Sequence, residues 1–195
     1  DYVYGEDGDD RLIGSSGNDY LDGGRGKDRI EGGDGDDIIY ESAGGDWIST
    51  PGSVLLGGAG NDNITGGRSG GLYIDGGSGN DIITSPGGDT ILGGIGDDEI
   101  SIAYRNPMSD WTFEEIDGGD GFDTLYLRYY GNGGLYTQDL SLVRGFEKLV
   151  IGSDTGRVYL ADTIFASGLT GTIEASGRGM SLDATAESDT DLLIR

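Results

Sequence analysis

A nine-residue repeat limits what this chain can fold into more than any other feature of its sequence. Near-complete copies of the pattern G-G-x-G-x-D-x-U-x, in which U is a large aliphatic residue, occupy 14–22, 23–31, 32–40, 41–49, 57–65, 76–84, 93–101 and 118–126. A weaker copy covers 5–13, and the second half of another covers 1–4. Self-similarity at a short fixed period indicates a repeat architecture, in which each unit packs against its neighbours.

The residue types within one copy predict its local structure. The glycine-rich part allows a tight turn with positive φ, and the x-U-x part is a short strand whose middle side chain points inward. Two copies then complete one coil, and successive coils stack at the strand spacing of ~4.8 Å. We therefore predict an all-β fold, a right-handed parallel β-roll, which is a β-solenoid with two nonapeptides per turn. Its core consists of Leu12, Leu21, Ile30, Ile39, Ile48, Ile64, Ile83, Ile91, Ile100 and Leu125.

The composition excludes several classes of function. The 195 residues include 36 acids, 27 of them Asp, against 12 Lys and Arg, so the net charge of -24 argues against nucleic-acid binding. Because His and Cys are absent, the usual general base and thiol nucleophile are missing, and we expect no enzyme activity in this chain. No apolar stretch is long enough to span a membrane. The chain begins at Asp1 without Met or a signal-peptide pattern, which we interpret as a fragment of a longer protein.

Alternate copies should place their loops on opposite edges of the roll, because one coil uses two copies. Taking the sixth position of each copy, we assign to the odd edge Asp10, Asp28, Asp46, Asp62, Asp81, Asp98 and Asp123. The even edge then receives Asp1, Asp19, Asp37, Ser53, Leu72, Asp89 and Glu114, and all irregular copy lengths fall on it. The two edges should therefore have different roles.

A column of stacked carboxylates requires cations. Neighbouring charges at the coil spacing repel by ~1 kcal/mol in water and by ~3–4 kcal/mol at an intermediate dielectric. Oxygen ligands in an irregular geometry suit Ca²⁺ better than Mg²⁺. Solvated turns are the alternative, since turns favour Asp and Gly, but they do not explain Asp at one fixed position in every odd copy. An EF-hand is excluded because its ligand pattern is missing.

The eight copies resemble the repeats of the RTX (repeats-in-toxin) family of secreted bacterial proteins. The resemblance implies that Ca²⁺ lies between consecutive loops of one edge, bound by Asp side chains and loop carbonyls. We expect about six ions on the odd edge and one to three on the even edge, where Asp19–Asp37 is the strongest interval. The carbonyls implied as ligands belong to Gly24, Gly26, Gly33, Gly35, Gly58, Gly60, Gly77, Gly79, Gly94, Gly96, Gly119 and Gly121.

The resemblance also implies a function. RTX proteins leave the cell through type I secretion machinery as unfolded chains, so we expect a module that folds on extracellular Ca²⁺ and acts as a scaffold of a larger secreted or cell-surface protein, a toxin or adhesin. The module could equally accompany an RTX enzyme in the parent chain. In a second hypothesis, the aromatic segment 104–136, with Trp111 and Tyr130, binds a glycan or a protein. We favour the alternative that these aromatic side chains fill the break in the repeat and plug the roll, because such a break needs apolar filling.

The remainder of the chain lacks the nonapeptide but keeps runs typical of strands. We divide the chain into an RTX calcium-binding β-roll at 1–126 and a C-terminal flanking region at 127–195. The second region should continue as a β-solenoid without calcium loops and cap the roll, because a solenoid end otherwise exposes core and unpaired strand edges.

Overall fold

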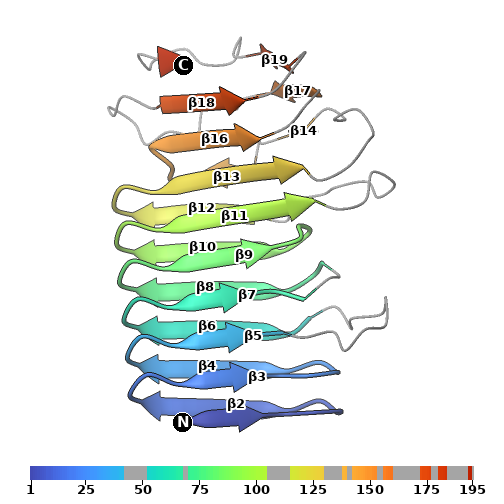
Figure 1. Cartoon of the computed structure of the whole chain (residues 1–195), viewed down its shortest axis with the longest axis vertical. Helices are drawn as coiled ribbons and strands as arrows, with labels where there is room; N and C mark the ends of the chain where they lie inside the picture. Colours follow the sequence, from blue (N-terminus) through green and yellow to red (C-terminus); the bar gives the residue numbers. More distant parts are fainter. Residues whose placement is uncertain are drawn as a thin grey trace.

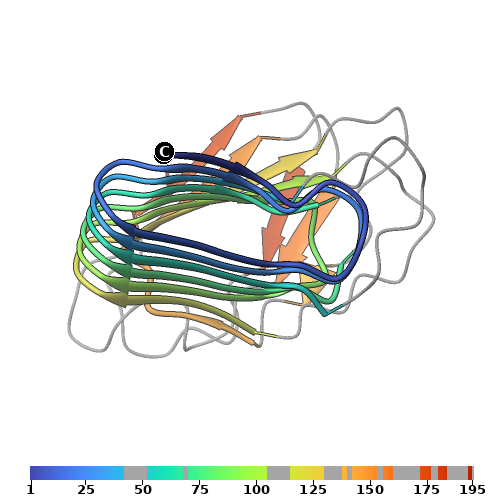
Figure 2. The same ribbon diagram turned by 90° about the horizontal axis from the view of Figure 1, so that it is seen from below.

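The computed structural model of the chain is built from parallel strands. It describes residues 1–41, 52–67, 70–104, 115–129, 138–139, 142–152, 156–159, 172–176, 180–183 and 193–194. Within these ranges every regular element is a β-strand, and no helix is long and apolar enough to cross a membrane. The coils stack into a flattened column (Figure 1), and seen along its axis two sheets face each other across the core (Figure 2). The predicted all-β parallel roll is confirmed.

Each coil between β1 and β16 contributes one strand to each of two sheets. The ten-stranded sheet contains, in spatial order, β1 (Tyr2–Tyr4), β3 (Tyr20–Asp22), β5 (Ile38–Tyr40), β7 (Asn63–Thr65), β9 (Ile82–Ser85), β11 (Glu99–Tyr104), β13 (Thr124–Tyr129), β16 (Lys148–Gly152), β18 (Thr172–Ser176) and β20 (Leu193–Ile194). The seven-stranded sheet contains β15 (Val143–Arg144), β12 (Glu115–Asp120), β10 (Thr90–Ile95), β8 (Tyr73–Ser78), β6 (Val54–Ala59), β4 (Arg29–Asp34) and β2 (Arg11–Ser16). A third sheet contains β14 (Gln138–Asp139), β17 (Gly156–Tyr159) and β19 (Met180–Asp183).

The core is one aliphatic side chain deep on each sheet. In the ten-stranded sheet the inward position carries Val3, Leu21, Ile39, Ile64, Ile83, Ile100, Leu125 and Leu149, which are in register along the column. The facing column carries Leu12, Ile30, Leu55, Ile74, Ile91, Ile116 and Val143. All but Val3 are buried, and each buried Leu or Ile contributes roughly 1.5–3 kcal/mol.

The core prediction is confirmed at nine positions and was incomplete. Leu55, Ile74 and Ile116 were missed, because each precedes the first glycine of a copy instead of following its Asp. Ile48 lies outside the described residues. Except for β15, the strands of the seven-stranded sheet are also longer than the predicted x-U-x, since each continues through the first three positions of the next copy.

The two edges of the roll differ in loop length. One edge, here called the three-residue edge, joins the sheets through 17–19, 35–37, 60–62, 79–81, 96–98 and 121–123. The opposite edge, here called the variable edge, uses connections 5–10, 23–28, 41–53, 66–72, 86–89 and 105–114. Between β2 and β13 the uniform loops form the left side of Figure 1, and the variable edge lies on the right.

This arrangement corrects the assignment of acids to edges. The strand register pairs Ile38 with Asn63, so the coil after Asp37 continues at Asp62, and the pairing of Arg29 with Val54 places Ser53 after Asp28. The three-residue edge therefore carries Asp19, Asp37, Asp62, Asp81, Asp98 and Asp123, and the variable edge carries Asp10, Asp28, Ser53, Leu72 and Asp89. The prediction that one edge holds every irregularity in copy length is confirmed. The predicted odd and even columns exchange edges at 41–53, so the odd-edge aspartates after this connection lie on the same edge as Asp19 and Asp37. The cause is that copy 41–49 was counted as half a coil, whereas 41–53 is one connection.

The C-terminal region continues the ten-stranded sheet. Strand β16 pairs with β13, β18 with β16 and β20 with β18, all in parallel. The predicted continuation of the solenoid is confirmed for these strands. The domain boundary at 126/127 stays a prediction, and β13 extends across it.

Candidate metal centre

A column of aspartates follows the three-residue edge, and each side chain is tied to the backbone of the preceding coil. The backbone N–H groups of Asp19, Asp37, Asp62, Asp81 and Asp98 each donate to Oδ1 of the aspartate in the next coil, at 2.8 Å. The N–H of Asp123 donates to Oε2 of Glu147 at 2.7 Å, which extends the column by one residue. One oxygen of every carboxylate is thereby fixed by the fold.

The second oxygen of each aspartate in this column has no hydrogen-bond partner among the described residues. In that part of the chain, the buried side-chain oxygens without a hydrogen bond are Oδ2 of Asp10, Asp19, Asp28, Asp37, Asp62, Asp81, Asp98 and Asp123, and Oε2 of Glu41. Buried carboxylate oxygens are ordinarily hydrogen-bonded or paired with a cation, because desolvation of an unpaired charge is costly. A regular series of such oxygens therefore indicates bound cations.

Each unpaired aspartate oxygen lies close to the first glycine of its copy, near a carbonyl oxygen or carboxylate of the next coil. A Cβ added to Gly14 would lie 2.5 Å from Asp19 Oδ2 and 2.5 Å from the carbonyl oxygen of Gly32 in the next coil. The same pair of oxygens, one carboxylate and one carbonyl, meets at Gly32, Gly57, Gly76, Gly93 and Gly118. We call these six pairs of oxygens the regular cradles. A seventh of the same kind lies at Gly5 on the variable edge, between Asp10 Oδ2 and the carbonyl of Gly23.

Burial changes the protonation of the column. Desolvation raises the pKa of Asp62 and Asp98 to about 6 and that of Asp81 and Asp123 to about 7, although the donated N–H groups lower each pKa in part. Desolvation also raises the pKa of Asp28 and Asp37. At neutral pH such groups are fully ionised only when a cation compensates the charge.

The donor set suits a hard divalent ion. Carboxylate and carbonyl oxygens are what Ca²⁺ takes, and it tolerates the irregular geometry that Mg²⁺ does not. Within the described ranges no three acidic side chains gather into a metal-binding cluster, so any ion here must also use backbone oxygens. The residues present fit this requirement, because every regular cradle presents one of each.

A sequence model of the RTX calcium-binding nonapeptide repeat, four copies long, matches residues 4–39, 13–48, 53–69, 73–85, 83–101 and 111–127, which together cover more than half of the chain. The chain belongs to this family. Comparisons with curated proteins and with solved structures gave no match. The RTX repeats make this chain a calcium-binding structural module.

The RTX repeat is degenerate on the variable edge. Ser53 stands where an aspartate is expected, and its hydroxyl accepts the N–H of Asp28 at 3.0 Å. Leu72 is a buried apolar residue at the same place in the next coil. Asp89 accepts from the N–H of Leu72 at 2.9 Å and from the hydroxyl of Ser85, so both of its carboxylate oxygens have protein partners.

Three further residues, Asp1, Asp46 and Glu114, were predicted as calcium ligands. The side chain of Asp1 is 85% exposed, and its amino group, rather than its carboxylate, contacts Asp19 Oδ1. Asp46 and Glu114 lie outside the described residues.

The glycines of the second and fourth positions, predicted as carbonyl ligands, have a clear conformational role. All twelve have positive φ, and an added Cβ would overlap backbone of the preceding coil, as at Gly79 against the carbonyl of Gly60. Their carbonyls as ligands stay a prediction. The carbonyls that line the regular cradles belong to the first glycine of the following copy, which the sequence reasoning omitted, and to Gly145 at the last cradle.

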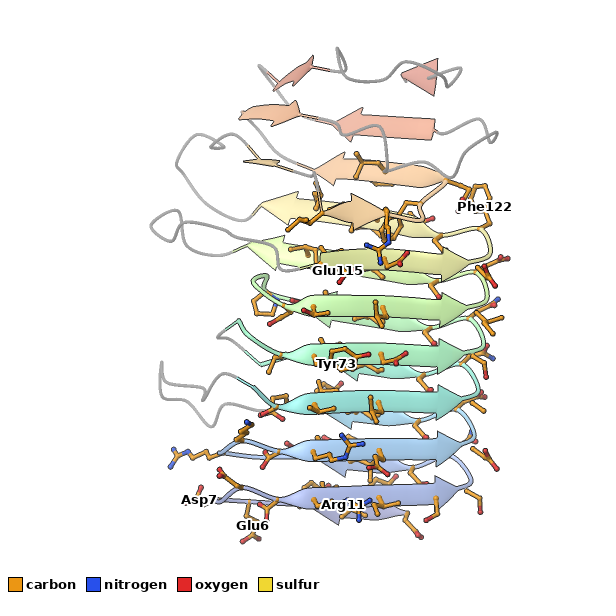
Figure 3. The ribbon with its side chains drawn as sticks, turned by 180° about the vertical axis from the view of Figure 1, so that it is seen from behind. Glu6, Asp7, Arg11, Tyr73, Glu115 and Phe122 are labelled. Carbon is orange, nitrogen blue, oxygen red and sulfur yellow. The ribbon has the colours of Figure 1, made fainter. Side chains whose placement is uncertain are left out.

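Two further features escaped the sequence reasoning. Glu41 and Glu147 are buried acids outside the sixth position of any recognised copy. The residue before each aspartate forms a second ladder at the three-residue edge, in which side chains of Asn18, Asp36, Asn61, Asn80 and Asp97 accept the N–H of the next coil at 2.7–3.0 Å. Phe122 ends this ladder and is exposed (Figure 3). The sequence signal that could have predicted this second ladder is Asn or Asp at the fifth position of the copies.

Proposed function

We propose that this chain is a folding module that is unfolded at low calcium and forms its β-roll when Ca²⁺ fills the three-residue edge. The observation that carries the proposal is the column of buried carboxylate oxygens without partners at that edge. We assign one ion to each of the six regular cradles, held by the aspartates from Asp19 to Asp123 with the carbonyls of the following coil, because each cradle brings together one carboxylate oxygen and one carbonyl oxygen. A seventh fits between Asp10 and Asp28 on the variable edge.

The bound ion supplies positive charge between carboxylates that otherwise repel. Without it the column contains buried groups of raised pKa and the chain carries a net charge of -24, so repulsion favours the expanded state. Because the ligands of one site come from two successive coils, ion binding and coil stacking are the same event.

This coupling suits a protein exported as an unfolded chain. Intracellular calcium is too low to fill weak sites, whereas sites of 10⁻⁴–10⁻³ M affinity, typical of extracellular modules, fill outside the cell. We therefore propose that the chain belongs to a larger protein that leaves through type I secretion machinery and acts outside the cell or on its surface. We further propose that this segment is a scaffold without catalytic activity of its own.

The alternative of an adhesion module rests on the aromatic segment 104–136. Trp111 and Tyr130 lie outside the described residues. Of this segment's aromatic side chains, Phe122 and Tyr126 are described, and Phe122 is 54% exposed. Binding of a glycan or protein by this segment stays a hypothesis, tested by retention of the chain on glycan or protein arrays with and without the double variant Trp111→Ala, Tyr130→Ala.

A calcium titration tests the proposed function. Far-UV circular dichroism and size exclusion are measured on one sample in EDTA, then with millimolar CaCl₂, and with MgCl₂ as the control ion. We expect an expanded coil in EDTA and a compact β-structure in calcium but not in magnesium. A chain that is equally folded in EDTA would show that the ions do not drive folding.

A further inference from the structure

Glu41 occupies a place in the repeat that glycine holds in the neighbouring coils. The N–H groups of Gly5, Gly23, Glu41 and Gly66 donate in turn to the carbonyls of Asp22, Tyr40, Thr65 and Thr84, at 2.8–3.0 Å. These four residues are therefore equivalent positions in four successive coils of the variable edge. Only Glu41 among them carries a side chain.

That side chain is folded into the roll. Glu41 is 4% exposed, and its Oε1 accepts the hydroxyl of Ser53 at 2.9 Å, while its Oε2 has no partner. Ser53 also accepts the backbone N–H of Asp28 through the same hydroxyl oxygen, whereas the Asp28 carboxylate accepts the N–H of Asp10 at 2.9 Å. The carboxylate of Glu41 is thus fixed, buried and half-satisfied.

The unpaired oxygen faces a second unpaired carboxylate oxygen. A Cβ added to Gly23 would lie 2.5 Å from Asp28 Oδ2 and 2.9 Å from Glu41 Oε2. In the regular cradles the corresponding two oxygens are the Asp Oδ2 and the main-chain carbonyl of the residue equivalent to Glu41. Here the side-chain carboxylate of that residue replaces its carbonyl. The space at Gly23 therefore presents two carboxylates where the other cradles present one.

No basic side chain balances this pair in the part of the chain that the structure describes. The charged groups that act on Glu41 are Asp28 and Asp22, and those that act on Asp28 are Asp9, Asp10 and Asp22, all of them acids. Two buried carboxylate oxygens facing one space require either a shared proton or a cation.

We propose that Asp28 and Glu41 form an additional calcium site on the variable edge, in the coil where the repeat loses its aspartate to Ser53. The inference rests on the proposed calcium binding of the regular cradles. Glu41 restores the negative charge that Ser53 removes, so the ion column of this edge extends one coil beyond Asp10–Asp28. A carboxylate at the first position of a copy can thus compensate for a missing aspartate at the sixth.

The test is a count of bound ions. Native mass spectrometry and equilibrium dialysis against Ca²⁺ are applied to the wild-type chain, to Glu41→Gln, and to Glu99→Gln, a matched control in which an exposed carboxylate is neutralised. Glutamine keeps the shape of Glu41 and the acceptor for Ser53. We expect Glu41→Gln to bind one ion fewer per chain and Glu99→Gln to bind the wild-type number, with both variants folded at saturating calcium by circular dichroism.

A second variant tests whether the length of the Glu41 side chain matters as well as its charge. Glu41→Asp keeps the charge but is one methylene shorter, and we expect it also to lose or strongly weaken one site. If both Glu41 variants bind as many ions as the wild-type chain, the pair shares a proton and the inference is overturned. If the wild-type chain itself binds no calcium, the proposed function fails along with it, so the two failures are distinguishable.

Discussion

The three-residue edge and the variable edge are built from the same repeat, yet only the first has kept its length and its acids through six coils. Its loops are three residues long in every coil, whereas the connections of the variable edge range from 4 to 13 residues. Two ladders of side-chain to backbone hydrogen bonds follow the three-residue edge, one from the aspartates and one from the residues before them. Insertion of a residue would break both ladders and separate the two halves of a cradle.

The variable edge shows what replaces the ladder when it is lost. Leu72 contributes to the core, Ser53 accepts the N–H of Asp28, and Asp89 is bonded to protein groups through both oxygens. Ser53 and Asp89 thus accept backbone N–H groups without leaving a free carboxylate oxygen, and Leu72 replaces the carboxylate by an apolar side chain. The two edges are seen together in Figure 3, where Glu6 and Asp7 lie on the variable edge and Phe122 on the opposite edge. Loop length is therefore uniform on the edge where both ladders of side-chain to backbone hydrogen bonds join successive coils.

The largest expected difference between the edges comes from a glycine. Gly79→Ala on the three-residue edge places a Cβ on the carbonyl of Gly60 at a φ of +123°, so we expect a loss of at least about 3 kcal/mol in the free energy of unfolding. Gly52→Ala on the variable edge has a similar φ of +107° but meets the flexible side chain of Lys27, and should lose only about 1–2 kcal/mol. Urea unfolding in saturating calcium measures both, and equal losses would show that φ alone decides.

The second largest difference between the edges is expected when one buried aspartate of each edge is neutralised. In Asp81→Asn the oxygen that accepts the N–H of Asp62 remains, but the unpaired Oδ2 is replaced, so we expect the calcium midpoint of folding to rise several-fold. In Asp89→Asn the amide can still bond to Leu72 and Ser85, and the midpoint should change less than about two-fold. Midpoints from circular dichroism titrations decide, and a similar shift in both variants would contradict the two-edge account.

The pH dependence follows from the raised pKa values of the three-residue edge. A buried carboxyl whose folded pKa is about 6 or 7, against about 4 when unfolded, stabilises the metal-free fold at acid pH, and this stabilisation is lost as the pH rises through 6 to 7. In EDTA the chain should therefore gain β-structure at pH 5 relative to pH 8. With calcium present, protons compete for the same oxygens, so the calcium midpoint should be higher at pH 5.5 than at pH 7.5. A midpoint that does not change with pH would place the ions elsewhere.

The smallest expected effect concerns the second ladder. Asn61→Ala removes the acceptor of the Asn80 N–H, an exposed bond of 2.7 Å, and should lower the free energy of unfolding by about 0.5–1 kcal/mol without moving the calcium midpoint more than slightly. Thermal unfolding in excess calcium measures it. A large rise in the midpoint would mean that the outer ladder shapes the cradles.

The sequence predicted the three-residue edge well because each of its loops lies inside one intact copy. Copies 14–22, 32–40, 57–65, 76–84, 93–101 and 118–126 each contain the glycines, the aspartate and the following strand without interruption. Each is also preceded by a strand with a central aliphatic residue, such as Leu55 before Gly57. If the strand before each copy had been counted as part of the repeating unit, Leu55, Ile74 and Ile116 would have been predicted in the core.

The prediction was wrong where a connecting loop has the sequence pattern of a nonapeptide copy. Residues 41–49 match the nonapeptide, but counting copies in alternation assumes that every copy is half a coil, and only the strand register shows that 41–53 is a single connection. The buried position of Glu41 and the extension of the column to Glu147 could not be predicted either, since both depend on which coils become neighbours. The sequence also could not predict that, in each aspartate of the three-residue edge, one carboxylate oxygen is hydrogen-bonded and the other is not, because this depends on the folded backbone.

Anomalous diffraction from crystals of the calcium-loaded chain would show whether calcium ions occupy the three-residue edge between successive coils. We expect one anomalous peak in each of the six intervals from Asp19 to Glu147, within binding distance of the second carboxylate oxygen of each aspartate. A folded roll without peaks along that edge, or with ions confined to the variable edge, would contradict it.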